Sequence, residues 1–241
     1  KCVGKIAQKC RDALARLGCK TVAVGALTAV AACRLCPHVQ PPKRQDAMPE
    51  PASNDDLSSI ITDLDRKVHW LSAWIIHNAN HVRPSRDGLK VGGHQASSAS
   101  LASVLSALYF GVLRPQDKVA VKPHASPAFH AIQYLYGRQT RDQLQRFRSL
   151  GGAQSYPSRT KDQDDVDFST GSVGLGVAVT AFASIVQDML LAQGRMDPAQ
   201  SGRMISLLGD AELDEGNIYE ALIEGAKHDL RNCWWIVDYN R

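Results

Sequence analysis

The stretch RMISLLGDAELDEGN (residues 203–217), followed by CWWIVDYN (233–240), decides the fold. The apolar run 203–208 predicts a buried strand, residues 211–230 predict a helix, and residues 233–239 predict a second strand. A strand, a helix and a strand in this order form a parallel unit with a right-handed crossover. The carboxyl ends of both strands then lie at one edge of the sheet, where α/β proteins bind ligands.

Acidic residues crowd the end of the first strand: Asp210, Glu212, Asp214 and Glu215. Asp210 follows one strand and Asn240 follows the other, so their side chains are expected to meet at one edge. Carboxylate and amide oxygens suit Mg²⁺, and the N–H groups at a helix start suit a diphosphate. The same acidic residues also favour a helix start without any ligand, so the cluster alone leaves both interpretations open.

Outward from this unit, strands alternate with helices, and the strands are continuously apolar, which is typical of a parallel sheet covered on both faces. The fold class we expect is therefore α/β, with a mostly parallel sheet and helices on both faces. The other expected helices begin at Asn54, Leu101, Ser126, Thr140 and Val177, the other expected strand is 118–122, and the glycine-containing loops are 83–95 and 167–176.

Charge and cysteine divide the chain unevenly. Residues 1–47 hold nine Lys or Arg against two Asp, whereas the remainder holds 19 basic and 22 acidic residues. The main part therefore has no basic excess that would favour nucleic acid. Five of the six cysteines lie in the first 36 residues, and a main part with Cys233 alone fits a reducing compartment, so we expect a cytoplasmic location without membrane attachment.

Residues 1–53 are expected to be an N-terminal extension and linker, with residues 54–241 as the domain. The run TVAVGALTAVAAC (21–33) resembles an export signal with a lipoprotein box, although it is too short to span a bilayer. CRLC (33–36) lacks the second ligand pair of a zinc site. We favour Met48 as the true start, with residues 1–47 as a misread upstream extension, and keep the export signal as the alternative.

Several blocks in order carry a family resemblance: KVGGHQASSAS, KPHASPAFHAIQYL, GGAQSYPSR, DFSTGSVGLG, and GDAELDEGN followed by DYN. Together they resemble the transketolase-like thiamine diphosphate enzymes, most of all the homodimeric type of pyruvate dehydrogenase. The resemblance covers roughly residues 55–241 and implies thiamine diphosphate and Mg²⁺ as cofactors.

The resemblance implies a role for each matching residue of the diphosphate motif. Asp210 and Asn240 match the Mg²⁺ ligands, and the third family ligand would fall at position 242, beyond this chain. Gly209 opens the motif. Ala211 stands where the motif has its second glycine, which is acceptable if its φ is negative. Glu212 matches the motif's glutamate, and the resemblance implies that it orients the helix start or the metal's waters.

The remaining blocks supply the other implied site residues. His94 and His124 match the family's active-site histidines, whereas His130 lies within a helix and is expected to be structural. The resemblance implies cofactor contacts at Ser97, Lys122, Ser172 and Val173, and a substrate-side tyrosine at Tyr156.

The expected function is the diphosphate-binding domain of a 2-oxoacid dehydrogenase, truncated at its C-terminus and inactive alone. In the family, the glutamate that contacts the cofactor's pyrimidine ring comes from a second domain, usually on the partner subunit, so the resemblance implies a homodimer. It also implies a lipoyl acyltransferase as a possible partner. Two alternatives stay open at this stage: a transketolase acting on sugar phosphates, and a structural remnant that binds no cofactor.

Overall fold

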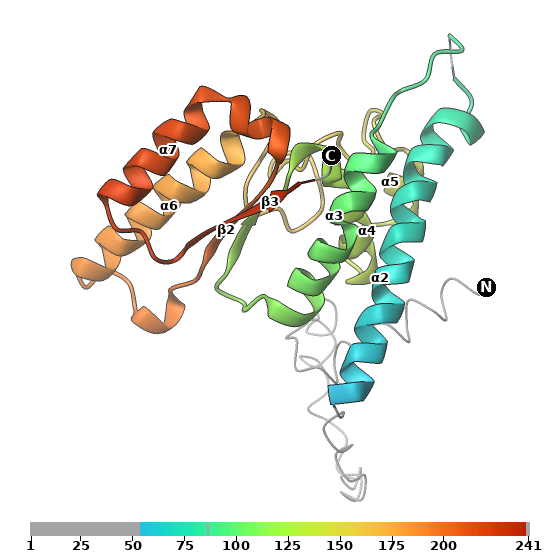
Figure 1. Ribbon diagram of the computed structural model, residues 1–241. Coiled ribbons are helices and arrows are strands. Elements are labelled where there is room, and N and C mark those ends of the chain that lie inside the picture. Colours follow the sequence, from blue (N-terminus) through green and yellow to red (C-terminus); the bar gives the residue numbers. More distant parts are fainter. Residues whose placement is uncertain (1–53, 86, 240–241) are drawn as a thin grey trace, which may run out of the picture.

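The computed structural model describes residues 54–85 and 87–239, and its centre is a parallel sheet covered by helices on both faces (Figure 1). The strands are β1 (Lys118–Ala120), β2 (Met204–Gly209) and β3 (Cys233–Asp238), in the order β1-β2-β3. Gly209 is in register with Asp238 at the carboxyl end. The expected α/β class is confirmed. Asn240 and the whole extension 1–53 lie outside the described residues.

Strand β2 is buried along its full length because both of its faces are covered. Ile205 and Leu207 pack into the larger core, while Leu208 packs into a smaller core on the opposite face. Alternate side chains of a strand point to opposite faces, so a continuously apolar strand is what this position requires.

The larger core lies between the sheet and α2 (Asn54–His77), α3 (Gln95–Ala107) and α4 (Ser126–Leu135). The apolar stripe expected on the first helix supplies Leu64, Val68 and Ile75, each almost fully buried. Helices α2 and α3 each end in one wider turn, Asn78–Val82 and Leu108–Val112. The short α5 (Arg141–Gln145) begins after Thr140, whose hydroxyl accepts the N–H of Gln143.

The smaller core is formed by α6 (Leu175–Ala192) and α7 (Gly216–Lys227), which lie together on the opposite face of the sheet (Figure 1). By length and apolar composition alone α6 could cross a membrane. Its residues Val177 and Ala181 instead pack with Leu208 of β2, which favours a core helix of this domain.

The segment after β2 differs from the expected helix 211–230. Asp210–Asp214 form a 3₁₀ turn, and α7 begins only at Gly216. The side chain of Glu212 accepts the N–H of Gly209 at 3.0 Å, which holds the chain in a tight turn before the helix starts. The acidic residues therefore lie in a turn of their own and not in the first turn of a long helix.

Candidate functional site

A cavity of about 730 Å³ lies at the carboxyl edge of the sheet. This volume is typical of a site for a small molecule or cofactor. Four segments line it: the start of α3, the turn after β1, the loop before α6 and the turn after β2. The lining residues are Gly93, His94, Gln95, Ala96, Ser97, Lys122, Pro123, His124, Val173, Gly209, Asp210, Ala211 and Glu212.

Two histidine rings face each other in this cavity. The ring centroids of His94 and His124 are 4.3 Å apart, and Tyr156 lies beyond His124 at 5.9 Å. His94 precedes α3, and Gly93 before it has φ +123° with its missing Cβ position 3.2 Å from Ile76, so glycine is needed there. His124 lies in the 3₁₀ turn Pro123–Ala125 after β1.

The surroundings of His124 favour the neutral form of its imidazole. Burial lowers the pKa of its imidazole below the ordinary value, and the nearby His94, Lys122 and Arg148 lower it further. A neutral imidazole can accept a proton from a group bound beside it, and can return that proton later.

The turn after β2 places a carboxylate and exposed backbone at the mouth of the cavity. Asp210 is half-buried directly after Gly209, and Ala211 is exposed. Among the described residues other than glycine, only Arg148 and Asp229 have positive φ, so Ala211 adopts an ordinary conformation. Alanine is therefore acceptable in place of the motif's second glycine, because the backbone here does not need a positive φ.

Glu212 connects two walls of the cavity. Its Oε1 accepts the N–H of Gly209, and its Oε2 accepts the N–H of Gly174 at 3.1 Å. Gly174 has φ +75°, and a Cβ there would lie 2.5 Å from Asn217, so the loop before α6 can take this position only with glycine. Both carboxylate oxygens thus fix the protein backbone.

Most of the expected site residues line this cavity, with three exceptions. Ser172 is exposed and does not line the cavity, Tyr156 lies against the ring of His124 without lining it, and Asn240 lies outside the described residues. The expectations missed the pairing of Lys122 with Asp238, whose atoms Nζ and Oδ2 are 3.0 Å apart. Asp238, a charged residue at the end of the last strand, was the sequence feature that could have predicted this ion pair.

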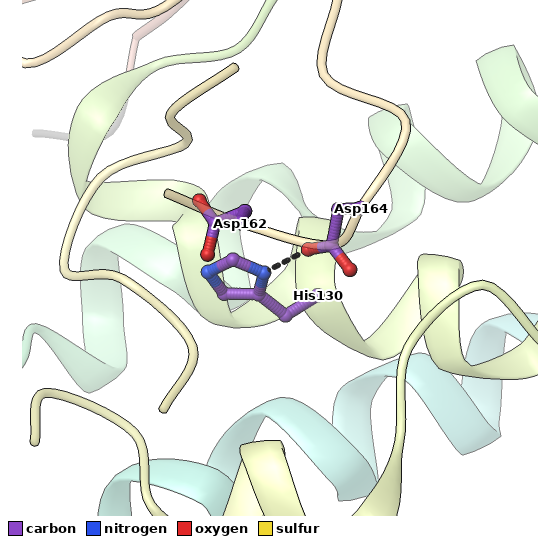
Figure 2. Close-up of side chains that lie close together, drawn as sticks. All are labelled: His130, Asp162 and Asp164. Atoms are coloured by element: carbon purple, nitrogen blue, oxygen red, sulfur yellow. Dashed lines mark hydrogen bonds and ion pairs between the residues drawn. The ribbon is translucent and has the colours of Figure 1, made fainter. Parts of the chain in front are cut away.

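A second polar cluster lies away from this cavity and has the composition of a metal site (Figure 2). His130 is fully buried, its Nε2 donates to the carbonyl of Gln154, and its Nδ1 is bonded to Asp164. Asp162 accepts the N–H groups of Gln154 and Ser158 through its two oxygens. With both ring nitrogens engaged, His130 has no lone pair for a metal, and the expected structural role fits.

The His130–Asp164 pair holds a proton firmly. Burial opposes the charged imidazole, but the hydrogen bond to the Asp164 carboxylate and the negative charge of that carboxylate raise the pKa of His130 above its ordinary value. Burial raises the pKa of Asp164 as well. Both shifts retain the shared proton, so the pair fastens α4 to the 154–166 loop that carries Tyr156.

The fold and the site define an α/β domain with a ligand-sized cavity at the carboxyl edge of a parallel sheet. Residues 93–241 match the family model "Transketolase, thiamine diphosphate binding domain". The chain therefore belongs to this family of thiamine diphosphate-binding domains.

Named relatives agree with this family. The pyruvate dehydrogenase E1 component of Mycolicibacterium smegmatis is 31% identical over 219 residues, covering 80% of this chain and 23% of the relative. The Escherichia coli K12 E1 component is 28% identical, with 74% and 21% covered. Transketolase from Campylobacter jejuni has a TM-score of 0.57 at 25% identity, covering 74% of this chain and 28% of its own. The chain thus spans about a quarter of these relatives.

The chemistry of the donor set fits a metal-bound diphosphate. Asp210 and Glu212 make the cavity mouth negative, and the cation of Lys122 is neutralised by Asp238. A bare diphosphate would be repelled, whereas one carrying a divalent cation would be held beside Asp210. Val173, which is 40% exposed, offers an apolar wall suited to an aromatic ring.

Proposed function

We propose that this cavity binds the magnesium complex of thiamine diphosphate, and that the chain is the diphosphate-binding part of a 2-oxoacid dehydrogenase. The observation that carries the proposal is the gathering of the family-matched residues around one cavity, from four segments spread over residues 93–212. When bound, the cofactor's thiazolium ring stabilises the negative charge left by cleavage beside a carbonyl.

Each residue of the chain has a distinct task in this proposal. Asp210 holds the divalent cation with oxygen, which is the ligand Mg²⁺ prefers. Glu212 keeps the β2 turn and the loop before α6 at a fixed separation. Val173 excludes water from one side of the cavity. The neutral imidazole of His124 accepts a proton at a ring nitrogen, with His94 beside it as a second acceptor.

The reaction and the partners extend this proposal to the whole enzyme. Oxidative decarboxylation of a 2-oxoacid is supported by the relatives named pyruvate dehydrogenase E1 component. A homodimer and a lipoyl acyltransferase remain predictions from the family resemblance, and the cytoplasmic location remains a prediction from the cysteine distribution. Light scattering of the chain at increasing concentration tests the dimer, and a monomer throughout would count against it.

Calorimetric titration with thiamine diphosphate tests the binding proposal. We expect binding in the presence of Mg²⁺, and its loss with a chelator and in Asp210→Asn. Asp214→Asn is the matched control, because Asp214 is exposed in the same turn and does not line the cavity. Metal-independent binding, or equal loss in both variants, would contradict the proposal and favour a remnant in which the carboxylates only shape the turn.

A further inference from the structure

We propose that Lys122 and Asp238 form a buried strut that positions the site, and that Lys122 is not a ligand of the diphosphate. This rests on the function proposed above. It assigns Lys122 a role different from the cofactor contact that the family resemblance implies.

The ion pair crosses the end of the central strand. Nζ of Lys122 lies 3.0 Å from Oδ2 of Asp238, and the two side chains are 7% and 8% exposed. Lys122 follows β1 and Asp238 ends β3, so the pair spans the carboxyl end of β2, which lies between them. A Cβ on Gly209 would come within 2.9 Å of Nζ, so a larger residue there would make the lysine shift from its position beside Asp238.

One carboxylate therefore ties together both segments that carry the histidines. The hydroxyl of Ser100 in α3 donates to the same Oδ2 at 2.7 Å, and α3 begins directly after His94. The carbonyl of Lys122 accepts the N–H of Ala125, which closes the turn containing His124. Asp238 thus fixes the start of α3 relative to the turn after β1.

Charge balance explains why this lysine is unsuited to hold the cofactor. A buried cation is stable when a carboxylate pairs with it, and removing either partner leaves an unpaired buried charge. Because Asp238 neutralises Lys122, the pair adds little attraction for an anion at the cavity. The diphosphate then depends on the divalent cation at Asp210 for its charge compensation.

Four versions of this chain test the proposal: wild type, Lys122→Gln, Asp238→Asn and the double variant. Each single change should lower Tm by about 6–12 °C, because it removes the counter-ion of a buried charge. The double variant should return to within about 3 °C of wild type. Such non-additivity marks a pair that acts as a unit. Lys227→Gln is the matched control, since Lys227 pairs with Glu224 on the surface of α7.

Ligand titration of the same four proteins shows whether Lys122 positions the site or binds the diphosphate. With Mg²⁺, Lys122→Gln should weaken thiamine diphosphate binding at least about tenfold, because Asp238 is left charged beside the cavity. Asp238→Asn should bind inorganic pyrophosphate without Mg²⁺ more tightly than wild type, since Lys122 is no longer neutralised. The double variant should bind thiamine diphosphate within about threefold of wild type.

Three results would overturn the strut. If the double variant binds the cofactor as weakly as Lys122→Gln, Lys122 is a ligand. If the two single effects on Tm add in the double variant, the pair does not act as a unit. A double variant that does not fold would also contradict the proposal. A wild type that binds no cofactor would instead contradict the proposed function, because the Tm comparison needs no cofactor.

Discussion

Glu212 accepts the backbone N–H of Gly174 at 3.1 Å, although the two residues are 38 positions apart in the sequence. This bond sets the width of the cavity, because Glu212 belongs to the turn after β2 and Gly174 to the loop before α6. The geometry of the site thus depends on a carboxylate that is itself occupied by the protein.

Substitution of Glu212 should therefore loosen the cavity. Glu212→Gln keeps one acceptor oxygen but loses the charge and the second acceptor, so we expect about tenfold weaker thiamine diphosphate binding. Faster hydrogen exchange of the Gly174 amide should accompany it. Glu215→Gln, an exposed neighbour, is the control. Unchanged exchange at Gly174 would show that the bond does not hold the loop.

Gly209→Ala should be destabilising because its methyl group would meet Lys122 Nζ at 2.9 Å. We expect a cost of about 1–3 kcal/mol in the free energy of unfolding, as for other overpacked positions. Gly216→Ala has open space around it at the start of α7 and should be neutral or slightly stabilising. Denaturant unfolding of both variants measures the difference, and equal effects would contradict the crossing geometry.

The imidazole of His124 should titrate below its ordinary pKa in the folded chain. Burial is the main cause, and His94, Lys122 and Arg148 add to it. His94→Ala should raise this pKa toward the ordinary value, because it removes a neighbouring charge and admits water. Proton NMR of the histidine signals gives both midpoints. A midpoint at or above the ordinary value in wild type would refute a neutral His124.

Acid stability should depend on Asp117, whose side chain is fully buried against Arg203 and Arg114. Burial opposes its ionisation, but hydrogen bonds from both arginines lower its pKa to about 2. The resulting stability is present above about pH 4 and is lost as pH falls toward 2, amounting to about 1–2 kcal/mol. Unfolding of wild type and Asp117→Asn across this range should show a steeper loss of stability in wild type, and equal slopes would contradict this role of Asp117.

The His130–Asp164 pair should act as a structural hydrogen bond that retains a proton, and not as a metal site. Its stability contribution should be present below about pH 6.5 and fall as pH rises through the raised pKa of His130. Asp164→Asn should remove that decline. In an Asp210→Asn background, a chelator or added Zn²⁺ should leave Tm unchanged, whereas a rise with Zn²⁺ that Asp164→Asn abolishes would contradict the assignment.

Much of this arrangement follows from the order of strands and helices. The parallel unit around Gly209 predicts that Asp210 and the loop with His124 meet at one edge, because sheet topology brings strand ends together. The sequence does not predict which side chains pair with one another at that edge. The hydrogen bond of Glu212 to Gly174 and the ion pair of Asp238 with Lys122 depend on the paths of loops that are distant in sequence. The late start of α7 at Gly216 has a local origin, since the hydrogen bond from the Gly209 N–H to the Glu212 carboxylate favours a tight turn over a continuous helix.

Crystals of the full chain grown with thiamine diphosphate and Mn²⁺ in place of Mg²⁺ test the central claim most directly, because anomalous scattering locates the metal. We expect the metal to be coordinated by the carboxylate of Asp210, with the diphosphate bound to the same ion and the aromatic ring against Val173. A metal at the His130–Asp162–Asp164 cluster, or a diphosphate bound away from the carboxyl edge of β2, would contradict the account.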